Sequence, residues 1–488
     1  MTDLRLFNSL TREIETFKPV REGEARVYTC GPTVYNNPHI GNMRAYVFAD
    51  VLGRTLSFKG YKLTHVINIT DVGHLTGDTD AGEDKLEKAA AENAQSIWDI
   101  ARHYTEAYWA DIKALNIREP AKWSIATDYV PQMIDFAKGI ADQHCYELES
   151  GLYFDVTTVA DYGRLARAVT DEGEGRIQPV DGKRNAADFA IWRKTPPGET
   201  RQMEWDSPWG RGAPGWHLEC SVMSGDLLGF PFDIHTGGID HREIHHPNEI
   251  AQNQAHCCTN GLDVAANSGA NIWMHNNFLV ERSGKMSKSS GEFLRLQLLI
   301  DRGYHPLAFR MMCLQAHYRS ELEFSWEGLG AALVRLKRLV MAVDQVKQNA
   351  VSASANSDLD WEEGWKSAFD KEISDDLSTV TVLAHLDQLI GHQTNNPNEV
   401  LAMVDTIDSV LGLNLLTLTR ADLRIRPSAA TITEPEIVAI LDQRKQARAT
   451  KDFATSDRLR DELAAQGVEV MDGDPLGWDW RLGEGQPS

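Results

Sequence analysis

The sequence lacks the features of membrane and secreted proteins. Nowhere do its 488 residues approach the ~20 consecutive apolar residues that a membrane helix needs. Residues 1–15 are polar and charged, without the apolar core of a secretory signal. We therefore expect a cytoplasmic protein with no membrane partner.

Cysteines are few, and their scatter argues against a disulfide framework in a chain of this length. In a reducing cytoplasm each one is a core residue, a catalytic thiol or a metal ligand, and the core interpretation is the default. They are Cys30, Cys145, Cys220, Cys257, Cys258 and Cys313. No internal repeat is visible either, which argues against a solenoid or a propeller.

Positive charge is in deficit, because 49 Lys and Arg stand against 71 Asp and Glu, for a net charge of −22. This argues against non-specific binding to nucleic acid or to an anionic membrane, although a local basic patch can still bind nucleic acid. With 42% hydrophobic and 25% charged residues, the composition is that of an ordinary globular protein. The length predicts about three domains.

The order of strand and helix patterns predicts an α/β fold. A β-prone run at residues 26–30 ends at a Gly-Pro turn, residues 46–56 have helical spacing, and residues 63–69 form a second strand pattern. This succession indicates a parallel sheet. Further strands are expected at 232–235 and 272–275, and the end of the chain shows helices at 436–449 and 454–466 and a strand at 468–471.

The turn after the first strand carries a motif suited to phosphate. Residues 32–42 read Pro-Thr-Val-Tyr-Asn-Asn-Pro-His-Ile-Gly-Asn and lead into the predicted helix. A helix N-terminus presents backbone N–H groups and a positive dipole. Gly41 lets a ligand approach the backbone, and His39 can donate to a phosphate oxygen. The alternative is a helix cap with a solvated histidine.

A second motif, Ser-Gly-Lys-Met-Ser-Lys-Ser-Ser, occupies residues 283–290. Lys285 and Lys288 flank small hydrogen-bonding residues in a glycine-led loop. Such a loop can close over a triphosphate and neutralise charge on its leaving group. The alternative is a solvated charged turn, but Lys-Met-Ser-Lys-Ser is specific, and it follows the His-Ile-Gly-Asn motif in sequence.

Together the two motifs resemble the ATP signatures of class I aminoacyl-tRNA synthetases, usually written His-Ile-Gly-His and Lys-Met-Ser-Lys-Ser. Asn42 replaces the final histidine, and both side chains can donate a hydrogen bond to an oxygen. The resemblance implies a Rossmann-type core that activates an amino acid with ATP, releases pyrophosphate and charges a tRNA.

A third set of residues could bind a metal. Cys30 ends the first strand, Cys220 lies in a Trp-His-Leu-Glu-Cys-Ser segment, and His245 and Glu249 have the i, i+4 spacing of one helix face. Pro247 is tolerated there only in the first turn of the helix. Two thiolates, an imidazole and a carboxylate form a plausible Zn²⁺ shell. Spacing alone favours two core cysteines and a capped helix.

The segments around these residues resemble those of the cysteinyl-tRNA synthetase family. They are Thr29–Tyr35, Trp216–Ser221 and His245–Gln252, with agreement at residues 68–72, 273–275, 316–320 and 451–458. The resemblance runs from about residue 5 to residue 482. It implies one Zn²⁺ per chain, bound by Cys30, Cys220, His245 and Glu249, and Mg²⁺ with ATP.

The resemblance also implies the substrates and their contacts. ATP, L-cysteine and tRNA-Cys would bind, with the cysteine thiolate on the zinc. Gly31, Thr33, Thr70 and Trp216 would contact cysteine, and the ATP contacts would be His39, Gly41, Asn42, Gly238, Asp240, Lys285, Ser287 and Lys288. Among these, His39, Asn42, Lys285 and Lys288 would hold the phosphates and the transition state.

Some positions depart from the family pattern. Pro247 replaces an acidic residue, Thr236 stands where glycine is frequent, and residues 290–293 read Ser-Gly-Glu-Phe. The tail at residues 473–481 reads Gly-Asp-Pro-Leu-Gly-Trp-Asp-Trp-Arg. The tail departure bears on anticodon contacts and leaves the ATP and zinc motifs unaffected.

The tRNA-binding surface is predicted in the last segment. Arg444, Lys445 and Arg448 form a local basic run in an acidic protein, as phosphate contacts require, although a solvated helix face is the commoner origin of such a run. Trp478 and Trp480 could stack on bases or close a small core.

The expected fold is a Rossmann-type class I synthetase core with an inserted subdomain, a helical bundle and a small C-terminal α+β domain, in a monomer. The predicted divisions are the core at 1–117 and 206–294, the insertion at 118–205, a stem-contact and helical-bundle domain at 295–420, and an anticodon-binding domain at 421–488. Two alternatives remain: a tRNA-independent cysteine ligase of mycothiol synthesis, which lacks the last domain, and a catalytically silent zinc-binding paralogue.

Overall fold

A computed structural model describes most of the chain. The described residues are 1–72, 96–166, 182–257, 261–281, 284–285, 294–350, 359–391 and 396–482. At residues 284, 285, 359 and 360 the description covers the backbone only.

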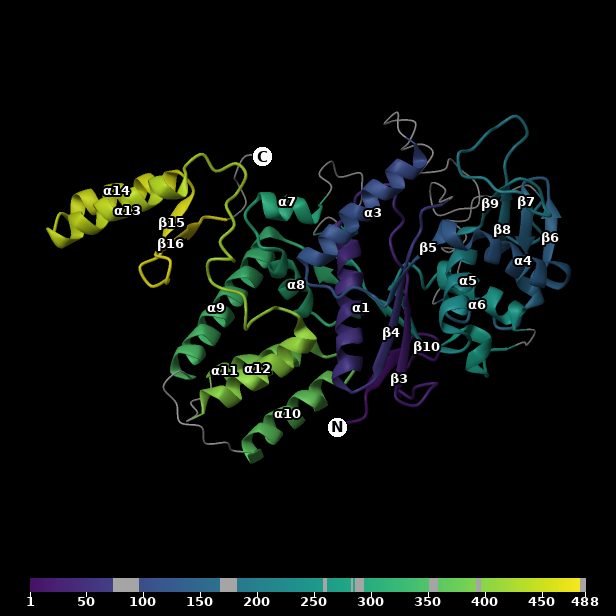
Figure 1. Cartoon of the computed structure of the whole chain (residues 1–488), viewed down its shortest axis with the longest axis horizontal. Coiled ribbons are helices and arrows are strands. Elements are labelled where there is room, and N and C mark those ends of the chain that lie inside the picture. The colour runs from purple at the N-terminus through teal and green to yellow at the C-terminus, as the bar shows by residue number, and fades with distance from the viewer. Residues whose placement is uncertain are drawn as a thin grey trace.

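A five-stranded parallel sheet forms the centre of the molecule (Figure 1), in the order β11-β10-β3-β4-β5. The chain passes from β3 to β4 on one side, while β10 lies on the other side of β3. The strand order therefore reverses between β3 and β10, which is where open α/β sheets bind ligands. The strands are β3 (Glu24–Thr29), β4 (Lys62–Ile69), β5 (Lys122–Ile125), β10 (Phe232–Gly238) and β11 (Ala270–Asn276).

Helices cover this sheet, so its strands are buried on both faces. The last five residues of β4 are all buried, and six of the seven residues of β10 are buried. Continuous burial of this kind is typical of parallel strands covered by helices on both sides. The helices of the core are α1 (Ile40–Phe58), α3 (Ile97–Ala114), α5 (Trp216–Leu228) and α6 (His245–His256).

A four-stranded antiparallel sheet comes between the two halves of the core in sequence, in the order β6-β7-β8-β9. It packs beside α4 (Val130–His144) at one end of the molecule (Figure 1). Gly215 joins β9 directly to α5, so this sheet determines where Trp216 begins that helix. The strands are β6 (Cys145–Leu148), β7 (Gly151–Phe154), β8 (Phe189–Lys194) and β9 (Gly212–Pro214).

Two smaller sheets flank the core. β1 (Arg5–Asn8) pairs with β2 (Glu13–Thr16), and the sheet β13-β12-β14 follows β11 in sequence. The strands of the latter are β12 (Leu279–Glu281), β13 (Gly284–Lys285) and β14 (Leu322–Glu323).

The second half of the chain is helical and ends in a small domain. The helical part comprises α7 (Leu296–Asp301), α8 (Pro306–Leu314), α9 (Trp326–Ala350), α10 (Leu359–Ile373), α11 (Thr379–Gly391) and α12 (Pro397–Leu411). The last domain comprises α13 (Glu434–Ala449), α14 (Phe453–Ala465), β15 (Val468–Val470) and β16 (Trp478–Trp480). No helix in the described part of the chain is both long and apolar enough to span a membrane.

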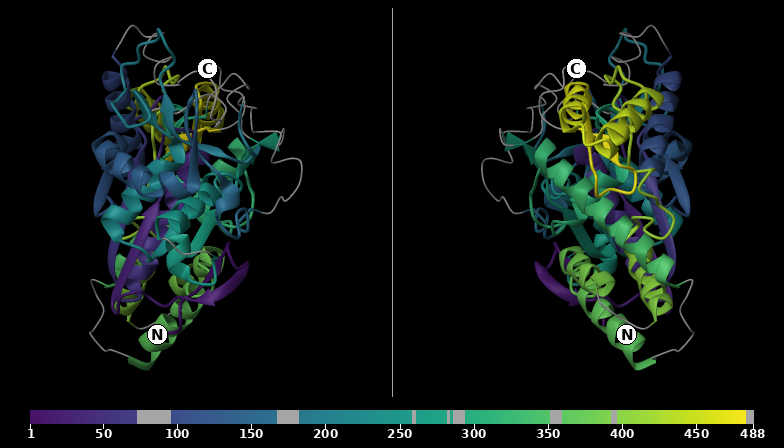
Figure 2. Two further views of the ribbon diagram at one scale, coloured as in Figure 1. Left: turned by 90° about the vertical axis from the view of Figure 1, so that its right-hand side faces the viewer. Right: turned by 90° about the vertical axis from the view of Figure 1, so that its left-hand side faces the viewer.

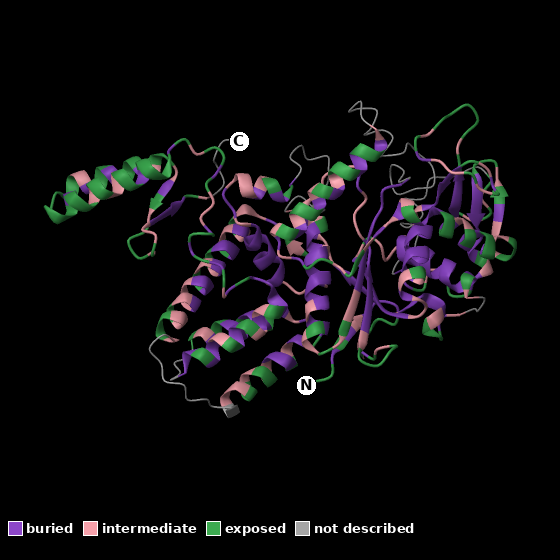
Figure 3. Ribbon diagram, viewed as in Figure 1, coloured by how far each residue is buried: buried purple, intermediate pink, exposed green. Residues whose placement is uncertain are grey.

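The last domain projects from the opposite end of the molecule to the antiparallel sheet (Figures 1 and 2). Its two helices are mostly exposed, whereas buried residues concentrate in the central sheet and its helices (Figure 3). Ile437 and Trp480 belong to a hydrophobic cluster that is separate from the main core.

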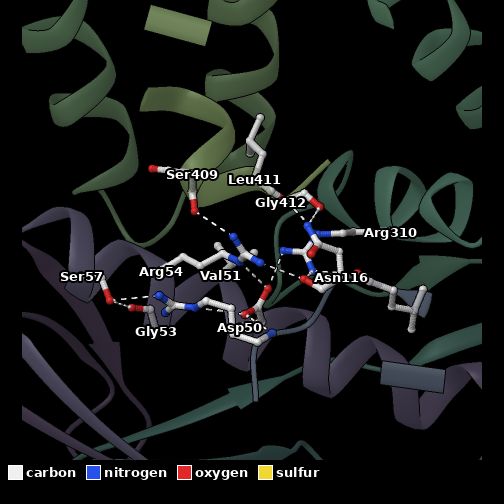
Figure 4. Close-up of polar contacts among 12 residues, drawn as sticks. Asp50, Val51, Gly53, Arg54, Ser57, Asn116, Arg310, Ser409, Leu411 and Gly412 are labelled. Carbon is white, nitrogen blue, oxygen red and sulfur yellow. Dashed lines mark hydrogen bonds and ion pairs between the residues drawn. The ribbon is translucent and has the colours of Figure 1, made fainter. Parts of the chain in front are cut away.

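A buried ion cluster joins α1 to the helical part (Figure 4). Asp50 of α1 accepts hydrogen bonds from Arg54 and from Arg310 of α8, each at 2.7 Å. Arg310 also donates to the carbonyl of Leu411, the last residue of α12, at 2.7 Å. Gly412 follows with φ of +66°, and a Cβ there would lie 2.5 Å from Nη2 of Arg310. The turn after α12 therefore fits around the guanidinium.

The predicted fold class is confirmed, including the parallel core, the inserted subdomain, the helical bundle and the small α+β domain. Strands and helices lie where the sequence pattern predicts them in both halves of the core and in the last domain. β5 comes after the proposed boundary at residue 117 and still joins the parallel sheet. The division at residues 117, 205, 294 and 420 stays a proposal. Cys258 lies outside the described residues.

Candidate active site

A pocket of about 310 Å³ opens at the carboxyl ends of β3 and β10. It brings together predicted residues from three separate segments of the sequence. The predicted residues that line it are Cys30, Gly31, Thr33, His39, Gly41, Asn42, Trp216, Gly238 and Asp240. Sequence reasoning missed Tyr104 and Tyr108 of α3, which also line the pocket, since only the packing of α3 shows which of its faces meets the site.

The first turn of α1 forms one wall of the pocket. His39 is the N-cap residue, and its backbone N–H donates to Oδ1 of Asn42 at 3.3 Å. A Cβ at position 41 would lie 2.7 Å from Cε1 of His39, so glycine is needed for the imidazole to lie over the helix start. No acidic residue occupies the first turn, which leaves the positive end of the helix dipole unopposed.

The four predicted metal ligands converge beside this pocket, which Cys30 also lines. Their ligand atoms all lie within 4.8 Å of one another, and all four residues are buried. The sulfur atoms of Cys30 and Cys220 are 4.0 Å apart, and Nε2 of His245 is 3.0 Å from Oε1 of Glu249. Around one tetrahedrally coordinated ion, with metal–ligand bonds of about 2.0–2.3 Å, the ligand atoms lie at distances of this size from one another. The set therefore fits one metal ion.

A second set of four residues shares Cys30 and Glu249 with the first. It adds His235, whose Nε2 is 2.9 Å from Oε2 of Glu249, and His246, whose Nε2 is 3.3 Å from Sγ of Cys30. Nδ1 of His246 in turn contacts Nε2 of His275 at 2.8 Å. Sequence reasoning did not propose these histidines as ligands. The available signals were a histidine within the buried strand β10, His235, and a second histidine directly after His245 at the start of α6, His246.

Mutual contacts shift the pKa values within the predicted set. A hydrogen bond with Cys30 lowers the pKa of Cys220 to about 6, although burial opposes it. Burial would raise the pKa of Glu249, but His235 and His245 lower it to about 2. Cys220 and Glu249 are therefore anionic at neutral pH, which is the state in which both bind a cation.

Trp216 and Thr70 connect the metal set to the pocket. The ring of Trp216 lies 4.3 Å from that of His245, centroid to centroid. Thr70 forms a β-bridge with Thr33 and donates its hydroxyl to Oε2 of Glu219 at 3.0 Å. The metal set and the pocket wall are thus one continuous packed unit.

The second sequence motif is only partly described. The backbone of Lys285 lies in β13 and pairs with Val280 of β12. The side chain of Lys285, and all of Ser287 and Lys288, lie outside the described part of the chain.

The predicted tRNA-binding residues lie in the last domain, away from the pocket. Arg444 and Arg448 both donate to Asp472, at 3.0 and 2.8 Å, and they lower the pKa of its carboxyl to about 2. Lys445 is exposed. Trp480 is buried, with its ring 5.2 Å from that of Trp478. In this structure Trp480 therefore packs inside the domain.

Comparison with known proteins agrees with this geometry. Residues 16–333 match the family model of the class I (C) tRNA synthetase catalytic domain, and residues 433–481 match the anticodon-binding domain of cysteinyl-tRNA ligases. A cysteine–tRNA ligase of Novosphingobium aromaticivorans is 74% identical over 98% of this chain and 97% of its own length. One from Zymomonas mobilis is 53% identical over 97% of both chains.

A solved structure shares the fold. Methionyl-tRNA synthetase of Mycobacterium tuberculosis, bound to methionyl-adenylate, aligns with a TM-score of 0.52 at 14% identity, covering 89% of this chain and 96% of its own. At this identity the likeness shows the fold alone. The two family models and the near full-length relatives go further: the chain belongs to the cysteinyl-tRNA synthetase family of class I.

Proposed function

We propose that this protein activates L-cysteine with ATP, giving cysteinyl-adenylate and pyrophosphate, and then transfers the cysteine to the 3′ end of tRNA-Cys. The observation that carries the proposal is the pocket itself. It has the start of α1, suited to phosphate, on one wall, and Cys30 of a buried metal-ligand set on another.

The ATP phosphates bind at the start of α1 in this proposal. His39 and the backbone N–H groups of the first turn donate to phosphate oxygens, and Gly41 leaves room for their approach. Gly238 and Asp240, at the end of β10, meet the ribose. Lys285, Ser287 and Lys288 meet the phosphates opposite α1, and Mg²⁺ accompanies the nucleotide.

The side chain of cysteine is recognised at the metal set. Cys30, Cys220, His245 and Glu249 hold one Zn²⁺, and their chemistry of two thiolates, an imidazole and a carboxylate suits that ion. When bound, the ion supplies a soft Lewis acid that takes a thiolate far better than the hydroxyl of serine. Because cysteine and serine are already strongly discriminated when the amino acid binds, no editing site is required.

The residues between the start of α1 and the metal set orient the amino acid. Trp216 walls the side-chain pocket, while Gly31, Thr33 and Thr70 position the backbone of the substrate. Held there, the carboxylate of cysteine faces the α-phosphate of ATP. This orientation supplies the proximity that makes the attack effectively unimolecular.

The tRNA is read by the last domain. Lys445 and the Arg444–Arg448 pair lie on α13 and offer contacts to phosphates. Asp472 already accepts hydrogen bonds from both arginines, so tRNA binding must compete with those pairs. The presence of this domain favours the tRNA ligase over a cysteine ligase that uses no tRNA.

The test is pyrophosphate exchange and tRNA charging with each of the twenty amino acids in parallel. Cysteine alone should support both reactions, and serine is the matched control because it differs only at the side-chain atom. Exchange without charging would indicate a tRNA-independent ligase, and the absence of cysteine-dependent exchange would contradict the proposed function as a whole.

A further inference from the structure

A buried arginine near the start of α1 is bound by backbone carbonyls. Arg44 is 2% exposed and donates to the carbonyl oxygens of Asn277 at 2.9 Å, Ser320 at 2.6 Å and His317 at 3.3 Å, and also to that of Phe278. Burial lowers its pKa from the usual value. A buried cation is costly unless its donors are satisfied, so these contacts fix the guanidinium and the four carbonyls in one arrangement.

The four carbonyls belong to the base of one small sheet. Asn277 and Phe278 come directly before β12, and His317 and Ser320 come shortly before β14. β12 pairs with β14 on one side and with β13 on the other, where Val280 lies opposite Lys285. Arg44 therefore holds the segments that lead into β12 and β14, and β12 pairs with β13, the strand that carries Lys285.

The chain returns to the same helix after the second motif. The backbone N–H of Ile40, in the first turn of α1, donates to the carbonyl of Leu294 at 2.9 Å. Phe278 and Leu294, which flank the second motif on either side, are thus both bound to the first turns of α1. The same turns present His39 and Asn42 to the pocket.

We propose that Arg44 is a positioning residue for adenylate formation: it sets the place of the strand that carries Lys285 relative to His39 and Asn42. This inference rests on the proposed function, in which those residues bind ATP from opposite sides. Arg44 does not line the pocket and acts only through the strands it holds. Catalysis that depends on orientation loses about 100-fold in rate for a misplacement of about 1 Å.

The chain offers a matched control. Arg26 in β3 is also buried, at 4% exposure, and also donates to two backbone carbonyls, those of Leu228 and, at 2.7 Å, Pro231. It lies near the opposite end of the sheet from the pocket. Arg26→Met removes a buried guanidinium from the same core, together with its ion pair to Asp233 (Nε to Oδ2, 3.6 Å), without touching the strand that carries Lys285.

The experiment measures cysteine-dependent pyrophosphate exchange, zinc content and melting temperature for the wild type, Arg44→Met, Arg44→Lys and Arg26→Met. Both methionine variants should melt at lower temperature. Below that temperature Arg44→Met should lose about 100-fold in kcat with an unchanged KM for cysteine and full zinc, while Arg26→Met keeps its kcat. Arg44→Lys, which retains three donors, should recover part of kcat.

Two outcomes would overturn the inference. One is a folded Arg44→Met protein with the kcat of the wild type. The other is an equal loss of kcat in Arg44→Met and Arg26→Met, which would mean that the loss reflects stability alone. A wild-type protein without cysteine-dependent exchange would instead defeat the proposed function, so the two failures are distinguishable.

Discussion

Cys30 and Glu249 each belong to both candidate ligand sets, so neither residue can reveal which set binds the ion. The residues that differ are Cys220 and His245 in one set, and His235 and His246 in the other. The set with two thiolates is the softer one and suits Zn²⁺ and a thiolate substrate together. It also contacts Trp216, which lines the pocket.

Replacing Cys220 by serine should therefore remove the metal and cysteine activation together, because a serine hydroxyl is a poor zinc ligand. His246→Asn is the matched control from the other set, and it should retain one Zn²⁺ per chain. Metal content, measured by mass spectrometry on both variants, decides which ligand set binds the ion. Loss of zinc from His246→Asn, with retention in Cys220→Ser, would assign the ion to the second set.

A buried histidine in β4 makes stability depend on pH. Burial lowers the pKa of His65 to about 4, and its Nε2 lies 2.8 Å from the hydroxyl of Thr29. Between about pH 4 and 6.5 the unfolded chain binds the proton more readily than the folded one, so stability rises with pH through that window. The full effect is about 3 kcal/mol.

His65→Gln removes this titration. Denaturant unfolding of the wild type should show stability increasing from pH 4 to pH 6.5, and the variant should show a smaller increase over the same range. Parallel curves for the two proteins would mean that His65 does not change its protonation on folding.

Among the elements, α1 connects three parts of the structure. Its first turn lines the pocket, Arg44 holds the sheet β13-β12-β14, and Asp50 binds Arg310 of α8. Burial would raise the pKa of Asp50, but Arg310 and Arg54 keep it below its ordinary value. Asp50 is therefore charged at neutral pH and compensates a fully buried arginine.

Asp50→Asn should lower the free energy of unfolding by about 3–5 kcal/mol, because it removes the carboxylate that pairs directly with the buried charge of Arg310. Asp135→Asn, which breaks an exposed pair with Lys138 at 3.0 Å, is the control and should cost at most about 1 kcal/mol. Chemical denaturation measures both. Equal and small losses would show that Arg310 is adequately satisfied by its carbonyl partners.

Local patterns predicted the elements well where they are long and regular. The core strands and helices are present, since hydrophobic periodicity is a local signal. The four-residue ligand set came from the family resemblance, because spacing alone favoured core cysteines, and the fold brings those four residues together. β5 was missed because Lys122–Ile125 is short and its place depends on pairing with β4. The contacts of Arg44 and Asp50 join residues far apart in the chain, and only the packed fold determines such distances.

At the scale of the whole molecule, the last domain is attached through a few buried ion pairs. Lys337 of α9 and Arg420 both donate to Asp479 in β16, and Arg420 also donates to Asp474 at 2.8 Å. Leu423 still belongs to the main core, whereas Ile432 belongs to the separate cluster of the last domain. A deletion that spares the core should therefore begin after Leu423.

Deleting residues 428–488 should leave pyrophosphate exchange nearly intact and should strongly reduce tRNA charging. The pocket and the metal set lie wholly outside the deleted part, and the proposed tRNA contacts lie inside it. Both reactions are measured on full-length and truncated protein at equal zinc content. A truncated, folded enzyme that charges tRNA as well as the full-length one would show that the domain does not read tRNA.

The fit of the turn at Gly412 around Arg310 also limits how segments of related proteins can be recombined into one chain. A side chain at position 412 would collide with the guanidinium, and the guanidinium in turn compensates Asp50. These three positions, contributed by α1, α8 and the end of α12, form one unit, so a replacement at any one of them alone should destabilise the fold. A chimera that joins the core of one relative to the helical bundle of another should fold only when all three residues are compatible, whatever the overall identity of the parents.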